Sequence, residues 1–254
     1  MTSDDLDLAE ELARGAGQIL LALRERDGSA VSGASGDRES NQYLLDALSR
    51  KRPGDAVLSE EAADDPRRLA AERVWIIDPL DGTREFAEQS DDGSWRSDFA
   101  VHVALWTQSG GLAGGVVGLP ARDLVYRSDS VPFVPPAVPS EPVRVAVSRS
   151  RPPRLVSEIG RELPVQLVPM GSAGVKVMAV VSGEADAYIH GGGQYEWDSA
   201  APVAVALGAG LHASRLDGSP LLYNQSDPWL PDLLVCHKQA APTLLAILAK
   251  IEGN

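Results

Sequence analysis

The chain has 254 residues, of which 44% are hydrophobic, and a formal net charge of −13. This is enough apolar material for one large domain or two closely packed halves. The acidic balance argues against a protein that binds nucleic acid through a basic face, whereas a phosphorylated small molecule could bind through metal ions and a few basic side chains. Cys236 is the single cysteine, and no apolar run is long enough for a membrane span, so we expect a cytoplasmic protein.

Two helical patterns come before the first strand. Residues 4–26 place leucines at helical spacing, with acidic residues in the first turn. Residues 27–36 are rich in Gly and Ser and predict a loop or a weak hairpin. A second helix is expected to begin at Asp37 and to end near residues 53–54, and in that position Asp37 would have the common role of N-cap.

Two expected strands end in acidic residues. The short strand 56–58 leads to Glu60, and the strand 74–77 leads directly to Asp78 and Asp81. If these strands are neighbours, the three carboxylates meet at one sheet edge, where ligand sites of α/β proteins form. The residues between the strands, 64–72, are charged and predict a short exposed helix.

The stretch from Asp78 to Thr83 has the composition of a metal-dependent phosphate site. Asp78 and Asp81 lie three residues apart, and two carboxylates held so close repel each other unless a cation lies between them. Mg²⁺ takes oxygen ligands from carboxylates, backbone carbonyls and water. Gly82 lets the backbone approach a ligand, and a helix that begins at Thr83 would direct free N–H groups at a phosphate.

The following segment predicts an antiparallel meander. After a polar loop at 87–97, residues 98–106 alternate strictly, with large apolar side chains on one face and small ones on the other. His102 lies on the second face, where we expect a packed, hydrogen-bonded residue rather than a metal ligand. Residues 114–119 and 124–127 predict two further strands.

Five prolines in residues 131–142 predict an extended connector between two halves, 1–138 and 139–254. The second half alternates between strands and helices, which predicts a smaller α/β sheet. The expected strands are 144–147, 165–168, 185–189 and 233–236, and the expected helices are 152–163, 172–182, 198–210 and 241–251.

Three stretches of the second half are candidates for the site. Asp198 precedes a helix of small residues, where an N-cap is the simple interpretation, but it could also close a metal site at the junction of the halves. Residues 171–176 contain Ser172 and Lys176 and are similar to a phosphate-binding turn, without the spacing of a P-loop. Ser148 and Arg149 follow a strand and form a second candidate anion contact. For these two stretches, a solvated loop is an equally good interpretation.

The D-P-L-D-G-T sequence at 78–83 resembles the signature of the inositol monophosphatase superfamily of Mg²⁺-dependent, Li⁺-sensitive phosphatases. Asp37, Glu60 and Trp197-Asp198 resemble three further family positions in the same order, so the resemblance covers nearly the whole chain. It implies an α/β (α+β) fold, an α-β-α-β-α layered sandwich of the inositol monophosphatase and fructose-1,6-bisphosphatase type, and a homodimer.

The resemblance also implies a role for each matching residue. Two or three Mg²⁺ ions would be held by Glu60, Asp78, Asp81, Asp198 and the carbonyl of Leu80. The catalytic residues would be Glu60 together with Asp37 and Thr83, the pair that would orient and activate the attacking water. The residues in contact with substrate would be Glu60, Leu80, Asp81, Gly82, Thr83, Ser148, Arg149, Ser172, Lys176 and Asp198.

Within the superfamily, D-G-T-R-E-F at 81–86 is similar to the variant typical of 3′(2′),5′-bisphosphate nucleotidases of the CysQ type. The glutamate that contacts inositol in inositol monophosphatases corresponds to Gly191, which also favours a nucleotide. The K-x-D-x-S-P-V-T run that is usual in the family is replaced here by residues 29–36. We therefore expect the loop at this position to interact with the metal differently from the family's loop.

We therefore expect a Mg²⁺-dependent phosphatase that removes the 3′-phosphate of 3′-phosphoadenosine 5′-phosphate to give AMP, acts on the 5′-phosphosulfate form, and serves sulfate assimilation. The nearest alternative is an inositol-1-phosphatase or fructose-1,6-bisphosphatase that uses the same metal site. A phosphatase with an aspartyl-phosphate intermediate fits less well, because its motif is D-x-D-G-T and this chain has D-x-x-D-G-T. A nucleotide or metal sensor without turnover is a third alternative, and the presence of all the inferred catalytic groups argues against it.

Overall fold

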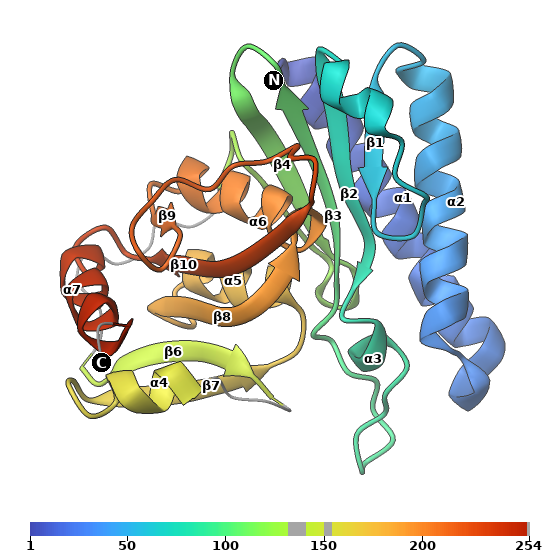
Figure 1. Ribbon diagram of the computed structural model, residues 1–254. Helices are drawn as coiled ribbons and strands as arrows, with labels where there is room; N and C mark the ends of the chain where they lie inside the picture. Colours follow the sequence, from blue (N-terminus) through green and yellow to red (C-terminus); the bar gives the residue numbers. More distant parts are fainter. Residues whose placement is uncertain (132–140, 150–153, 253–254) are drawn as a thin grey trace.

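The computed structural model describes residues 1–131, 141–149 and 154–252, and these form five layers in the order α-β-α-β-α (Figure 1). The predicted layered sandwich is therefore confirmed. The first sheet has the strand order β1-β2-β3-β4-β5, with β1 parallel to β2 and the others antiparallel. The two strands that lead to acidic residues are therefore neighbours, as expected, and the predicted meander follows them. Its strands are β1 (Ala56–Ser59), β2 (Arg73–Asp81), β3 (Ala100–Thr107), β4 (Gly111–Leu119) and β5 (Leu124–Arg127).

The first outer layer consists of α1 (Ser3–Asp27) and α2 (Gly33–Lys51). The expected loop at 27–36 is shorter than predicted, because it contains the 3₁₀ helix η1 (Gly28–Ala30) and α2 begins within it. The Ser32 hydroxyl caps α2 by accepting from the Ser35 N–H at 3.2 Å. Asp37 lies inside the helix, so its interpretation as an N-cap was wrong.

The pleat of β2 divides its apolar residues between two cores. Trp75 and Ile77 pack with α1 and α2, whereas Val74 and Ile76 face the central layer. The predicted small-residue face of β3 also lies in the central layer and lets α6 (Glu196–Gly208) come close to the sheet. The approach is closest at β4, where a Cβ on Gly115 would lie 2.8 Å from the Ala201 Cα.

The second sheet has the order β7-β6-β8-β10-β9. Helix α5 (Ala173–Ser182) shares the central layer with α6, while α4 (Arg154–Ile159) and α7 (Ala241–Glu252) pack on the outer face. The strands are β6 (Val143–Ser148), β7 (Val165–Met170), β8 (Ala187–Tyr195), β9 (His212–Ser214) and β10 (Trp229–Cys236). The sequence pattern missed β9, since three residues are too few to establish an alternation.

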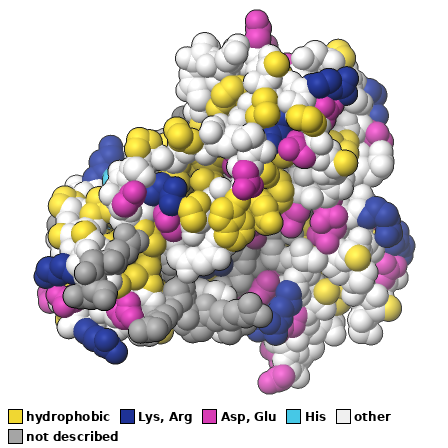
Figure 2. Space-filling model, in the orientation of Figure 1, with side chains coloured by type: hydrophobic (Ala, Val, Ile, Leu, Met, Phe, Trp, Pro, Cys, Tyr) yellow, Lys and Arg dark blue, Asp and Glu magenta, His cyan; other side chains and the backbone are white. Residues whose placement is uncertain are grey.

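The predicted proline-rich connector lies almost wholly outside the described residues, as does the boundary at residue 138, so the division into two halves stays a prediction. Within the described ranges, no helix is long and apolar enough to cross a membrane. On the face shown in Figure 2, hydrophobic side chains gather in a patch over the region where the second sheet comes near the first, and acidic side chains lie beside it.

Arg24 fastens the C-terminal end of α1 to the segment that follows β2. Its side chain is buried and donates hydrogen bonds to the carbonyl oxygens of Phe86 at 2.8 Å, Arg96 at 2.9 Å and Glu85 at 3.1 Å. Its guanidinium also lies 4.4 Å from the centroid of the Phe99 ring. Burial lowers the pKa of Arg24 to about 10, which leaves the group charged at neutral pH.

We predict that Arg24→Met lowers the free energy of unfolding by about 3 kcal/mol, because three buried carbonyl groups lose a charged donor. Arg26→Met is the matched control, since the Arg26 side chain is 59% exposed and solvent screens its ion pair with Asp27. Urea unfolding followed by circular dichroism measures both variants. Equal destabilisation by the two substitutions would contradict the fastening role of Arg24.

Candidate active site

Three aspartates from two elements that are distant in the sequence lie close together. Asp78 and Asp81 lie at the end of β2, and Asp198 lies in the first turn of α6. One carboxylate oxygen of each is within 4.8 Å of the others. Asp198 is the third residue of its helix rather than the N-cap, and its carboxylate accepts from the Tyr195 N–H at 2.6 Å. The structure thus brings together the aspartates that the sequence placed in different elements.

The close approach of these acids is electrostatically unfavourable without a cation. Burial, reinforced by the charges of Glu60 and Asp81, raises the pKa of Asp78 well above its ordinary value. Burial and the charge of Asp81 raise the pKa of Asp198 to about 6. Asp78 Oδ2 is buried and has no hydrogen-bond partner within the described part of the chain. An acceptor-only oxygen without a donor, beside two other carboxylates, fits a hard divalent cation.

Glu60 lies at the rim of this cluster. It follows β1, which pairs in parallel with β2, and its N–H donates to the Ile77 carbonyl at 3.4 Å. Its side chain is exposed to solvent, yet local loss of hydration and the charge of Asp198 raise its pKa to about 7. A fourth carboxylate, at the predicted sheet edge, therefore adds to the electrostatic repulsion among the aspartates.

The N-terminus of α5 holds Asp81. The carboxylate accepts hydrogen bonds from the Ser172 hydroxyl, from the Gly174 N–H at 2.6 Å and from the Ala173 N–H at 3.1 Å. Burial alone would raise the pKa of Asp81, but His102, Lys176 and Ser172 together lower it to about 2. This helix terminus therefore binds an anionic group, and that group belongs to the protein itself.

The interpretation of residues 171–176 as a solvated loop was wrong. Ser172 and Lys176 are both buried, and the Lys176 ammonium group lies 5.3 Å from the centroid of the Tyr188 ring. Burial lowers the pKa of Lys176, an effect that the nearby Asp81 opposes. Whether either side chain contacts a substrate stays a prediction.

His102 lies between Asp81 and the carbonyl of Trp197, the residue before Asp198. It is fully buried, its Nδ1 is 3.0 Å from the Trp197 carbonyl and its Nε2 is 3.3 Å from Asp81 Oδ2. Because a carbonyl only accepts, Nδ1 carries a proton. Burial opposes the charged imidazolium, but Asp81 outweighs it and raises the pKa of His102. The packed, hydrogen-bonded histidine was predicted correctly, whereas its contact with Asp81 depends on a strand register that the sequence alone does not show.

Thr83 and Asp37, the pair expected to orient a water, are neighbours. The Thr83 hydroxyl lies 3.3 Å from Asp37 Oδ1 and 3.1 Å from the Leu80 carbonyl oxygen. Burial, with a contribution from Glu61, raises the pKa of Asp37 to about 6. Gly82 has a left-handed φ of 91°, and a Cβ there would press on the Asp98 carbonyl at 3.1 Å, so glycine is required at this turn. The short helix α3 (Thr83–Phe86) begins where the sequence predicted it.

Arg149 is engaged by two carboxylates. It forms ion pairs with Glu85 at 3.1 Å and with Glu88, and these partners raise its pKa. Glu85 belongs to α3, so Arg149 connects the end of β6 with the segment after the central motif. Ser148 lies half-buried at the end of β6, and Ser150 and Arg151 lie outside the described residues.

A second connection between the two sheet regions had no signal in the sequence. Residues 64–72 contain the 3₁₀ helix η2 (Pro66–Ala70), which is short and mostly exposed, as predicted, but its Arg68 is only 1% exposed. Arg68 donates to Asn224 Oδ1 at 2.7 Å, and the Asn224 N–H in turn donates to Glu196 at 2.6 Å. Glu196 begins α6, so this chain of hydrogen bonds positions the helix that carries Asp198.

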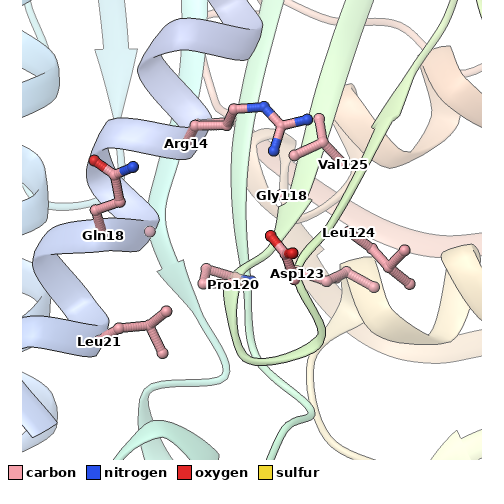
Figure 3. Close-up of a pocket in the computed structure, with 11 residues that line it drawn as sticks. Arg14, Gln18, Leu21, Gly118, Pro120, Asp123, Leu124 and Val125 are labelled. Atoms are coloured by element: carbon pink, nitrogen blue, oxygen red, sulfur yellow. The ribbon is translucent and has the colours of Figure 1, made fainter.

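A small cavity of about 90 Å³ lies apart from these groups, between α1 and the 3₁₀ helix η3 (Pro120–Arg122) (Figure 3). Arg14 and Gln18 line it from α1, and Asp123 lines it from the opposite side. Arg14 is paired with Glu10 at 2.8 Å. None of the residues that line this cavity belongs to the predicted site.

Comparisons with known proteins agree with this geometry. The model of the inositol monophosphatase family matches residues 2–131 and 138–252. Relatives named 3′-phosphoadenosine 5′-phosphate phosphatase are 52% identical in Mycobacterium leprae, over 97% of this chain and 94% of the relative, and 53% identical in Mycobacterium bovis, over 92% and 89%. The Escherichia coli K12 protein named 3′(2′),5′-bisphosphate nucleotidase CysQ is 29% identical, over 89% and 96%.

Solved structures lead to the same family. CysQ from Bacteroides thetaiotaomicron superposes with a TM-score of 0.77 at 25% identity, over 92% of this chain and 97% of that one. Inositol monophosphatase II from Staphylococcus aureus superposes with a TM-score of 0.79 at 21% identity, over 96% and 95%, and shows the fold alone. With matches along nearly its whole length, the chain is a phosphatase that belongs to the inositol monophosphatase family.

Proposed function

We propose that this phosphatase removes the 3′-phosphate of 3′-phosphoadenosine 5′-phosphate to give AMP, and that it acts on the 5′-phosphosulfate form in sulfate assimilation. The main support for the proposal is a sequence identity of 52–53% with relatives named for that substrate, together with the acidic cluster. Gly191 supports a nucleotide, since no carboxylate stands where an inositol ring would need one. We also propose that the protein forms a homodimer and lies in the cytoplasm.

Two or three Mg²⁺ ions are proposed to bind to Glu60, Asp78, Asp81, Asp198 and the Leu80 carbonyl. Bound there, such cations would compensate the charge of the phosphate and of the leaving oxygen, and they would lower the pKa of a water. The chain contributes the fixed positions of the ligands. Asp81 is fixed by α5 and His102, and Asp198 is fixed by the turn at Tyr195.

The proposed reaction forms a bond between a water oxygen and phosphorus as the bond from phosphorus to the 3′ oxygen breaks. Thr83 and Asp37 hold the water, and Asp37 accepts its proton, for which a pKa of about 6 is suited at neutral pH. The 3′ oxygen leaves with a proton taken from solvent. The N–H groups of Gly82 and Thr83 would bind phosphate oxygens, and Ser148, Arg149, Ser172 and Lys176 remain candidate substrate contacts.

Kinetics on three substrates test the proposal. With Mg²⁺, kcat/KM for 3′-phosphoadenosine 5′-phosphate should exceed the values for inositol-1-phosphate and fructose-1,6-bisphosphate by at least about 10-fold. Chelation of divalent cations should abolish phosphate release, and added Li⁺ should inhibit it. A higher kcat/KM for either sugar phosphate would show that the alternative substrates are the correct ones, and full activity without divalent cations would rule out the metal mechanism.

Asp81→Asn should reduce kcat by more than the roughly 10- to 100-fold expected for partners of metal ligands, since it removes a ligand charge. The Ala173 and Gly174 N–H groups donate to different oxygens of Asp81, and asparagine keeps only one of these oxygens, so the thermal unfolding midpoint should fall and kcat is measured at a temperature where the variant is folded. Asp123→Asn is the matched control, because Asp123 lies away from the site and asparagine tolerates its φ of 52°. Retention of normal kcat by Asp81→Asn would contradict the proposed ligand set.

Two substitutions of His102 separate its contacts. Asparagine can place its amide nitrogen near the Nδ1 position and keep the bond to Trp197, whereas glutamine can place its amide nitrogen near Nε2 and keep the contact with Asp81. We expect His102→Asn to weaken Mn²⁺ binding by about 10-fold and His102→Gln to weaken it less. Calorimetric titration with Mn²⁺ in the absence of substrate measures the difference. Equal, unchanged affinity in both variants would show that His102 only fills space.

A further inference from the structure

An exposed aromatic surface borders the acidic cluster. Tyr195 and Trp229 occupy paired positions on β8 and β10 and are 42% and 46% exposed. The Tyr195 ring stacks on Trp197 with centroids 4.8 Å apart and planes 10° apart, and Trp229 meets Tyr195 edge-on at 5.4 Å. We call these three residues the aromatic platform. Exposed aromatic groups at this density mark binding sites more often than ordinary surface does.

The platform and the cluster share one turn of the chain. The Tyr195 N–H donates to Asp198 at 2.6 Å, and the Trp197 carbonyl accepts from His102, whose other ring nitrogen faces Asp81. One stacked ring thus directly precedes Asp198 in the chain, and the other lies at the start of the turn. In Figure 2 the hydrophobic patch over β8 and β10 lies next to acidic side chains on the same face.

The backbone fixes the platform rings in place. Gly193 has a φ of 85°, and a Cβ there would lie 1.8 Å from two atoms of the Trp229 ring, so this ring rests directly on the backbone of β8. Trp197 packs against the central hydrophobic core on its inner side. A flat surface that is held in position before binding loses little conformational freedom when a planar ligand stacks on it.

We propose that the aromatic platform stacks the nucleobase of a 3′-phosphorylated nucleotide whose phosphate lies at the cluster, an inference that rests on the proposed function. In such a substrate a single ribose separates the base from the phosphate, and the platform is separated from Asp198 by a single turn. Stacking suits this place because it needs no positive charge, and the neighbouring cluster consists of aspartates. A purine offers more stacking area than a pyrimidine, so the platform assigns a purine nucleotide as the preferred substrate.

Aliphatic replacements of the two exposed rings test this inference. Tyr195→Leu and Trp229→Leu should each raise KM for 3′-phosphoadenosine 5′-phosphate by about 10-fold, the scale of one lost base-stacking contact, with a much smaller effect on kcat. The ratio of kcat/KM for this substrate to that for glycerol 3-phosphate, which has no base, should fall by a similar factor. Leu207→Ala, at a position 51% exposed on α6, is the control for loss of an exposed apolar side chain.

A binding measurement separates this inference from the proposed function. Calorimetric titration with AMP, in the presence of Mg²⁺, needs no turnover, and both leucine variants should bind AMP about 10-fold more weakly than the unmodified chain. That loss would support the platform even if another phosphate ester proved to be the better substrate. Unchanged AMP affinity and unchanged KM in both variants would overturn it while the proposed function stood. Dissociation of a dimer in the variants, with unchanged KM, would instead identify the platform as a subunit interface and would also overturn the inference.

Discussion

The mutual repulsion of carboxylates held within a few ångströms of one another is the constraint on which the rest of this structure depends. Asp78 and Asp81 belong to β2 of the first sheet and Asp198 to α6 of the central layer, so the repulsion acts between these two layers. Without a cation, the protein must oppose it with contacts of its own. The helix terminus and the imidazole that hold Asp81 supply these contacts, and both reach it from buried positions.

The same contacts explain why the site requires the whole fold. Asp81 is carried by the first sheet, but its hydrogen-bond donors belong to α5 of the central layer. Asp198 is carried by α6, whose start is connected to η2, beside the first sheet, through Arg68. The first sheet and the central helices therefore complete the environment of each other's carboxylate, and the central core that packs α5 and α6 on the first sheet sets their separation.

The sequence predicted the parts of the site that follow from local patterns. Glu60, Asp78 and Asp81 could be placed at one edge because short apolar runs of strand-forming residues indicated two strands, and parallel strands end together. Asp198 needed the family resemblance, since by itself it looked like a helix cap. His102, Arg68 and Ser172 were not assigned their observed contacts, because a contact between distant segments depends on strand register and helix packing rather than on neighbouring residues. The start of α2 was missed for a simpler reason: glycine and serine are read as loop formers, and here packing extends the helix through them.

The glycine at position 115 has a geometric consequence for the site. The backbone of β4 approaches Ala201 of α6 so closely that not even a methyl group fits between them. Asp198 lies about one turn before Ala201 on α6, so the depth at which this helix packs on the sheet affects how near Asp198 comes to Asp81. A residue with no reactive group thereby acts as a spacer of minimum thickness, and it limits the distance between the carboxylates of the acidic cluster.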